Sequence, residues 1–144
     1  PWTFLFIAVL PALIANGVTM SYIATNHFLN SLTAINDPLV NSLSVRAPRW
    51  LEWLHLQFGY HVEHHILPTV NGRHAATVRD VLRRLYGERY LSLPHRTALR
   101  LLYTRPKIHL GHDTLIDPRT GVTFNALAPG DLSMAALGTM VAPG

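Results

Sequence analysis

The chain has 144 residues, enough for one modest domain and too few to argue for two from length alone. Its formal net charge is +4, and it has nine histidines but no cysteine, so any chemistry of the histidines proceeds without thiolates. The basic balance lacks the clustered aromatic residues that nucleic-acid binding on a soluble scaffold requires, so no nucleic-acid partner is expected. Charge is spread unevenly: residues 1–36 carry none, and all twelve Lys and Arg lie at Arg46 or later.

The first predicted element is a membrane-spanning helix over residues 2–25. An uncharged stretch of this length exceeds the roughly 20 apolar residues that cross ~30 Å of hydrocarbon. It also lacks the basic leader and the early small-residue cleavage site of a signal peptide. A buried core helix of a soluble protein is the alternative, although the later segments offer little apolar mass to cover it. Because cationic residues concentrate on the cytoplasmic side of membrane proteins, everything after about residue 30 is expected in the cytosol.

The predicted span carries polar side chains at Asn16, Tyr22 and Asn26, which a single helix in lipid would leave poorly satisfied. Pro11 and Gly17 are also tolerated best in membrane helices that have neighbouring helices. The sequence therefore predicts an integral membrane protein of several spans, of which this chain is a C-terminal part.

An irregular connection is expected over residues 26–48, where Asn, Ser and Thr recur. Residues 49–60 then predict a helix with an apolar side, formed by Trp50, Trp53, Leu54 and Leu56. Tryptophans beside Arg46 and Arg49 suit a helix at the level of the lipid headgroups. An amphipathic helix packed on a protein core fits the same pattern.

A further helix is expected to begin at Gly72, capped by Asn71, and to end at Gly87. Its apolar residues recur at spacings of three and four: Ala75, Val78, Val81, Leu82 and Leu85. Arg79 and Arg83 form another face, for which solvent is the ordinary partner and anionic lipid or a protein donor is the alternative. A shorter helix is expected over residues 95–104.

Together these elements predict an all-α fold in three parts. Residues 1–28 form the last transmembrane helix, residues 29–105 form a cytosolic cap of amphipathic helices, and residues 106–144 form a C-terminal tail. The tail has turn-forming residues and little periodicity, so it is expected to wrap around the domain or to be partly mobile.

The sequence "HVEHH" at residues 61–65 is the strongest chemical signal. On a helix, His61 lies three and four residues before His64 and His65, so the three imidazoles can converge on one side. The adjacent pair diverges by roughly 100° around the axis, as ~3.6 residues per turn require, so it can also serve two metal ions. Neutral imidazole suits iron, zinc, copper and nickel, and the ligand set alone does not choose among them.

Zinc-hydrolase motifs fit poorly, because their glutamate stands elsewhere relative to the histidines. Glu63 is instead expected to orient a ligand by accepting the free N–H of an imidazole. His27, at the cytoplasmic end of the span and beside Asn26 and Asn30, is the local candidate for a further metal ligand. Ordinary hydrogen bonds are the expected role of four other histidines, His55, His95, His109 and His112, whereas His74 is left open.

These residues resemble a known family. "HVEHHILP" resembles the third histidine box of the membrane-bound fatty acid desaturases, whose pattern is His or Gln, two residues, then His-His. "TNHFLN", "NDPLVNSLSV" and "LHLQFGYHVEHHILP" are together similar to bacterial members, over roughly residues 1–105. The first two boxes of the family, HxxxH and HxxHH, occur nowhere else in this sequence. The chain should therefore be inactive alone.

The resemblance implies a membrane enzyme in which two iron ions, O₂ and two electrons introduce a double bond into an acyl chain. It makes His61, His64 and His65 iron ligands, with His27 as the nearest match to a further ligand. Some animal relatives place an asparagine four residues earlier, where this chain has Ile23, so a water-mediated contact would have to come from Asn26 or Asn30.

The implied partners are membrane lipid, an acyl substrate and an electron donor. The acyl group could be attached to a lipid, to CoA or to a carrier protein, and the electron donor could be a ferredoxin or a separate cytochrome b5. A hydroxylase or carotenoid oxygenase of the same scaffold is the nearest alternative. A zinc-dependent membrane hydrolase and a non-catalytic membrane module are the others.

Overall fold

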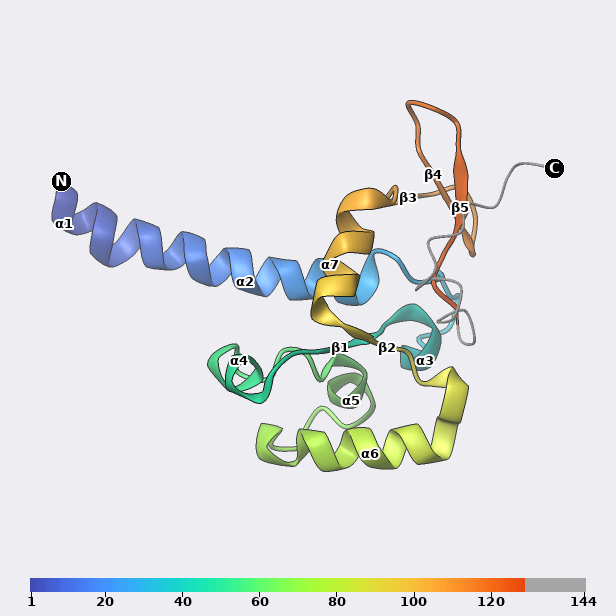
Figure 1. The fold of residues 1–144 in the computed structure, drawn as a ribbon, viewed down its shortest axis with the longest axis horizontal. Coiled ribbons are helices and arrows are strands. Elements are labelled where there is room, and N and C mark those ends of the chain that lie inside the picture. The colour runs from blue at the N-terminus through green and yellow to red at the C-terminus, as the bar shows by residue number, and fades with distance from the viewer. Residues whose placement is uncertain (129–144) are drawn as a thin grey trace.

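A long apolar helix leads the chain into a folded cap (Figure 1). The computed structural model describes residues 1–128, and residues 129–144, the end of the predicted tail, lie outside the described part. The helix runs from Trp2 to His27. It consists of α1 (Trp2–Phe4), a π-helical segment (Leu5–Val9) and α2 (Leu10–His27).

The π-helical segment lies directly before Pro11. The amide of Leu10 bonds to the carbonyl of Leu5, five residues earlier. Proline has no N–H to offer the carbonyl of Ile7, and its ring crowds the preceding turn, so a locally wider turn accommodates it. The helix therefore continues through Pro11 instead of ending there.

Exposure divides the long helix into two halves. Almost every side chain from Trp2 to Gly17 is exposed, and the most apolar window of the helix has none of its residues buried. Its length and composition are those of a helix able to cross a membrane. From Val18 onward the helix packs against the cap, and Tyr22, Thr25 and Asn26 are buried.

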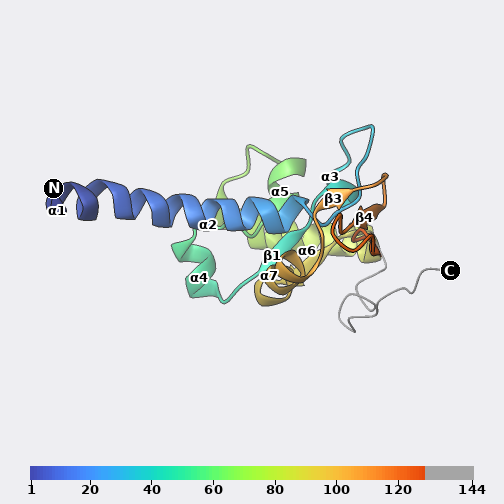
Figure 2. The ribbon, with the colours of Figure 1, turned by 90° about the horizontal axis from the view of Figure 1, so that it is seen from above.

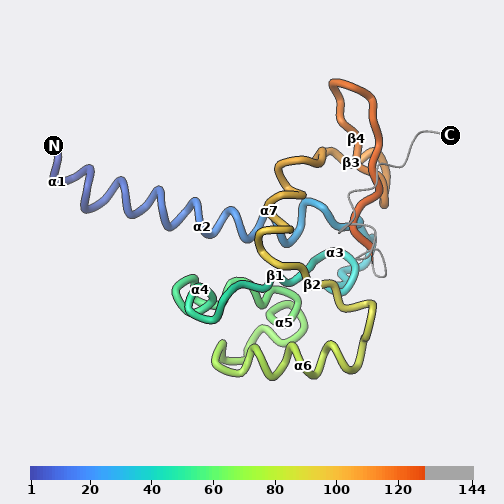
Figure 3. Tube along the Cα trace, viewed as in Figure 1, coloured from blue at the N-terminus to red at the C-terminus, as the bar shows by residue number. Residues whose placement is uncertain are grey.

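The cap consists of short helices and two small sheets. Its helices are α3 (Pro38–Asn41), α4 (Arg49–Leu54), α5 (His61–Ile66), α6 (Ala75–Tyr86) and α7 (His95–Thr104), with single 3₁₀ turns at Gly72–His74 and Gly87–Arg89. The strands are β1 (Ser44–Arg46), β2 (Ser92–Pro94), β3 (Ile108–His109), β4 (Thr114–Ile116) and β5 (Thr123–Asn125). Figure 3 shows α5 enclosed between β1 and α6, while α7 crosses the C-terminal end of α2.

The expected helices are present, but the prediction of an all-α fold is wrong in one respect, because the cap contains β-structure. β1 pairs in parallel with β2, with Val45 opposite Leu93, and β3, β4 and β5 form an antiparallel sheet. Each strand has only two or three residues. Alternation of apolar and polar residues becomes a signal only over about four to eight residues, so these strands leave no readable pattern.

The segment after Pro106 takes part in the core. Leu115, Ala126 and Leu127 are buried in the same apolar cluster as Tyr22 and Leu29, at the end of the long helix. The amide of Leu127 bonds to the carbonyl of Leu29 at 2.7 Å. The part of the predicted tail that the structure describes is therefore a packed sheet that holds the chain just after His27.

Three local predictions differ in outcome. α7 covers His95–Thr104, and Asn71 accepts a hydrogen bond from the amide of Arg73, as a cap does, so both predictions are confirmed. The predicted helix over residues 49–60 is too long, because α4 ends at Leu54. Leu56 and Gln57 follow with positive φ angles of 50° and 61°, which reverse the chain into the turn before α5.

Candidate metal centre

Three imidazoles meet where α2 ends beside α5. Nε2 of His61 lies 2.6 Å from Nε2 of His27 and 3.0 Å from Nε2 of His65. One ring nitrogen from each histidine lies within 4.8 Å of the other two. Two nitrogens that bind one ion at ~2.1 Å and at right angles are themselves ~3 Å apart. The spacing of these nitrogens is therefore close to that of neighbouring ligands of one metal ion.

His27 is held in a form suited to binding metal. Its Nδ1 lies 3.3 Å from the backbone carbonyl of Asn41 in α3, to which it can only donate. A proton on Nδ1 leaves the lone pair of Nε2 free, and this is the nitrogen that faces His61. The carbonyl of Asn41 thus has the orienting role that was expected of Glu63.

Two of the three imidazoles are biased towards the neutral form. Burial, together with the neighbouring His27, His65 and His64, lowers the pKa of His61 to about 3. Burial and the same neighbours lower the pKa of His65. Only neutral imidazole has a lone pair for a metal, so His61 and His65 are ready to bind one without first losing protons.

His64 does not join this cluster. Its ring centroid lies 6.1 Å from that of His65, in a different direction around α5, as expected for adjacent residues of a helix. It lines a cavity of about 430 Å³, which is bounded by α2, by the turn before α5, by α5 itself and by the start of α6. The lining is mostly apolar and includes Ile23, Leu56, Phe58, Leu67, Val70 and Val78, with His61 and Asn26 among its polar members.

Asn26 and Asn30 have different environments, although both are fully buried. Asn30 donates its side-chain N–H to the carbonyl of Asn26 at 2.6 Å and so closes the last turn of α2. The side chain of Asn26 lines the cavity, and neither its oxygen nor its nitrogen has a hydrogen-bond partner among the described residues. Because a buried amide without partners is costly, a polar ligand or water in this cavity would account for Asn26.

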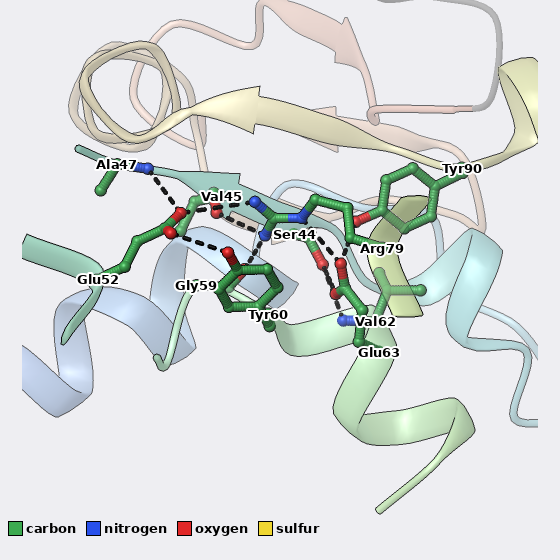
Figure 4. A network of polar contacts seen from close by, with 10 residues as sticks. All are labelled: Ser44, Val45, Ala47, Glu52, Gly59, Tyr60, Val62, Glu63, Arg79 and Tyr90. Atoms are coloured by element: carbon green, nitrogen blue, oxygen red, sulfur yellow. Dashed lines mark hydrogen bonds and ion pairs between the residues drawn. The ribbon is translucent and has the colours of Figure 1, made fainter. Parts of the chain in front are cut away.

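Glu63 belongs to a buried ionic network on the other side of α5 (Figure 4). Its carboxylate accepts hydrogen bonds from the hydroxyls of Ser44 and Tyr90, each at 2.5 Å, and from Nε of Arg79 at 2.9 Å. The expected bond to an imidazole is not among the hydrogen bonds of the described residues. Glu63 and Val62 face inward while His64 and His65 face outward, so the network sets the rotation of α5 and, through it, the direction of the histidines.

Arg79 joins this network to the neighbouring segments. Its guanidinium donates to the carbonyls of Val45 and Gly59 at 3.2 Å and lies 3.5 Å from the carboxylate of Glu52. It also stacks on the ring of Tyr60, with its central carbon 3.8 Å from the ring centroid. The hydroxyl of Tyr60 donates to Glu52 at 2.9 Å, and burial together with this bond raises the pKa of Tyr60 to about 12. The network thus connects β1, α4, α5 and α6.

The expectation of a solvated or lipid-binding face for Arg79 and Arg83 holds only for Arg83. Arg79 is 7 % exposed, whereas Arg83 is exposed. A signal for this was present in the sequence, because Arg79 lies four residues after Ala75 and three before Leu82, on the buried stripe. Two acidic residues in the preceding segment, Glu52 and Glu63, are the partners that such a buried cation needs.

The remaining histidines make contacts outside the cluster. Nδ1 of His55 lies 3.0 Å from the hydroxyl of Tyr22, and the ring of His95 stacks on that of Tyr22. His109 and His112 contact the carbonyls of Asn30 and Leu32. His74, left open by the sequence, is exposed and contacts Nε of Arg73.

These features define a mainly helical protein with a helix long and apolar enough to cross a membrane and, at the end of that helix, a histidine cluster able to hold a metal ion. The family model described as fatty acid desaturase matches residues 1–97, which is more than half of the chain. The chain therefore belongs to the fatty acid desaturase family, as its histidine box indicates. No curated protein and no solved structure is found to match it.

Proposed function

We propose that this chain forms the C-terminal part of a di-iron, O₂-dependent desaturase, an oxidoreductase that introduces a double bond into an acyl chain. The observation that carries the proposal is the meeting of His27 with His61 and His65. The first two of these lie 34 residues apart in sequence, yet their Nε2 atoms are 2.6 Å apart. Family membership agrees with it.

The residues present fit iron in both chemistry and spacing. His27, His61 and His65 would hold one ion through neutral imidazole nitrogens, which are suitable ligands for iron. His64 lines the cavity and would serve the second ion, together with ligands outside these 144 residues. Bound iron would supply, with O₂, an oxidant strong enough for an unactivated methylene, which no amino-acid side chain provides.

The cavity beside the histidines has the character of an acyl site. Its mostly apolar lining matches a hydrocarbon chain, and His61 and His64 lie on its wall. Asn26, whose side-chain amide has no hydrogen-bond partner in residues 1–128, offers a donor and an acceptor beside the same wall. These groups would hold a reactive methylene and a polar ligand next to each other.

The proposed enzyme is an integral membrane protein whose histidines lie on the cytoplasmic side. The long helix that begins at Trp2 crosses the bilayer, and the cap with its histidines lies on the cytoplasmic side, where ferredoxin or cytochrome b5 can deliver electrons. The position of the cationic residues supports this orientation, because all twelve follow the helix. The acyl substrate, on a lipid, on CoA or on a carrier protein, reaches the cavity from the membrane or its surface.

Metal analysis of the intact protein tests the proposal. The protein is purified with and without His61→Ala and His65→Ala, and iron and zinc are counted per chain, with the exposed His74→Ala as the matched control. We expect the cluster variants to lose iron and the control to keep it. Equal iron in all forms, or zinc in place of iron, would overturn the metal assignment. Product analysis of the active protein then separates an alkene from a hydroxylated chain or an oxidised carotenoid.

A further inference from the structure

The outer side of α4 is an exposed apolar surface outside the metal site and its network. Four side chains, here called the α4 patch, make it up: Trp50 is 67 % exposed, Trp53 76 %, Leu54 58 % and Leu56 82 %. They come from a six-residue helix and the turn that follows it. Single exposed apolar residues are ordinary on protein surfaces, but two tryptophans and two leucines together mark an interaction site.

The backbone conformation holds one residue of the α4 patch, Leu56, at the surface. Leu56 has φ +50°, a left-handed conformation that a leucine rarely adopts, and its side chain is the most exposed of the four. Such strain persists only where the surrounding structure imposes it. Here the amide of Gln57 donates to the carbonyl of Glu52 at 2.7 Å, and the amide of Leu56 donates to the carbonyl of Trp53 at 3.1 Å. The fold thus fixes an apolar side chain in an outward position.

The exposed charged side chains in the segment that carries the patch are all positive. Arg46 and Arg49 are exposed beside it. Glu52, the only acidic residue between β1 and α5, is 8 % exposed and turns inward to Arg79 and Tyr60. The buried network therefore removes the one carboxylate from this surface and leaves cations with aromatic and aliphatic side chains. This combination suits anionic and zwitterionic lipid headgroups above hydrocarbon.

The position of α4 matches the same partner. The turn after α4 contacts the long helix at Tyr22, whose hydroxyl lies 3.0 Å from Nδ1 of His55 and whose ring lies 6.1 Å from that of Phe58. Only about one helical turn further towards the N-terminus, the helix becomes fully exposed and apolar. Figures 1 and 2 both show α4 as the cap element that reaches furthest along the long helix towards its N-terminus.

We propose that the α4 patch lies in the headgroup layer of a phospholipid bilayer. Its tryptophans and leucines enter the upper part of the acyl region, and Arg46 and Arg49 contact lipid phosphates. The inference rests on the proposal that the long helix spans the bilayer, because the membrane surface must then lie where the polar cap begins. Leu56 also lines the cavity beside His61 and His64, so the patch places that cavity next to the lipid.

Tryptophan fluorescence in vesicles tests this directly, because the chain has three tryptophans, Trp2, Trp50 and Trp53. The full chain carrying Trp2→Phe is reconstituted in phosphatidylcholine and phosphatidylglycerol that are brominated either near the headgroup or near the chain end. We expect blue-shifted emission and stronger quenching by the shallow bromine than by the deep one. Adding Arg46→Gln and Arg49→Gln is expected to reduce that quenching in vesicles rich in phosphatidylglycerol, and unchanged quenching would overturn the phosphate contacts.

Two further variants make the outcome decisive. Tyr103, which is 81 % exposed on α7, supplies a matched control as Tyr103→Trp in a chain whose own tryptophans are replaced by phenylalanine, and it should not be quenched. Trp50→Phe with Trp53→Phe leaves only Trp2, which reports insertion of the long helix. Quenched Trp2 with unquenched patch tryptophans would overturn the proposal while leaving the span intact, and would indicate that protein covers the patch. If the tryptophan of Tyr103→Trp were quenched as strongly as the patch tryptophans, the whole cap would be adhering to the vesicle, and this result would overturn the proposal.

Discussion

Nε of Arg79 donates to the carboxylate of Glu63 at 2.9 Å, and this bond joins the middle of the histidine helix to α6. Both side chains are almost entirely buried, with 9 % and 3 % of their surface exposed. α5 has only six residues and no side-chain cap at its start, so it cannot hold its own position. The orientation of the metal ligands therefore depends on a salt bridge that contacts none of them.

Arg79→Met is expected to destabilise the protein strongly. It leaves the carboxylates of Glu63 and Glu52 buried without their cation, and removing one partner of a buried pair typically costs ~3–5 kcal/mol. Denaturant unfolding in detergent micelles measures the loss, and metal content shows whether the histidines still converge. Arg83→Met, on the exposed side of the same helix, is the control and should change the free energy of unfolding by less than about 0.5 kcal/mol. Equal losses in the two variants would show that Arg79 has no special role.

The metal-free protein is expected to lose stability in acid partly through His61. The pKa of His61 falls from 6.5 to about 3 on folding, so between these pH values the unfolded chain binds more protons than the folded one. The contribution of His61 to stability is therefore fully present above about pH 6.5 and is lost as the pH falls towards 3. Unfolding midpoints measured across this range should decline less steeply in His61→Gln, whereas the exposed His74→Gln should follow the wild type. An unchanged slope in His61→Gln would contradict the burial of a neutral imidazole.

His27 and His64 are expected to differ when each is replaced by alanine and cobalt is used as a spectroscopic probe. His27→Ala removes a ligand of the three-histidine cluster and should weaken cobalt binding there as His61→Ala does. His64 points away from the cluster, so His64→Ala should keep the cobalt absorption of that site. The absorption bands of bound cobalt, titrated at neutral pH, measure both effects. Loss of those bands in His64→Ala would place His64 in the same coordination sphere.

Gly59→Ala is expected to disturb the support of α5. A Cβ at this position would lie 2.7 Å from the backbone oxygen of Val45, and backbone cannot yield as a flexible side chain does. The carbonyl of Gly59 also accepts the amide of Val45 at 3.0 Å, so the two segments cannot separate without losing a bond. We expect a loss of ~1–3 kcal/mol in the free energy of unfolding.

Gly17→Ala is the matched control for that substitution. A Cβ at Gly17 meets nothing within 4 Å, and alanine favours a helix over glycine by up to about 1 kcal/mol. It should therefore be neutral or stabilising in the same unfolding assay. Similar destabilisation of both variants would argue against a close approach at Gly59.

Local patterns were enough to predict most helices of the cap and the contact between two of the three histidines of the metal cluster. α7 begins and ends where its sequence predicts, and Asn71 caps the 3₁₀ turn that leads into α6, because caps and apolar spacing act within a few residues. His61 and His65 meet because they lie four residues apart on one short helix, and that geometry follows from the helix alone.

The tertiary structure decided the rest, since it concerns residues distant in sequence. His27 meets His61 only because α2 and α5 are packed together by β1, by the core around Leu29 and by the network of Arg79. The same holds for the partners of Arg79, for the outward position of the α4 patch and for the two small sheets. Each of these features depends on contacts between segments that are distant in sequence, and the sequence of one segment does not indicate which other segment it will contact. The energy of those contacts outweighs local conformational preference.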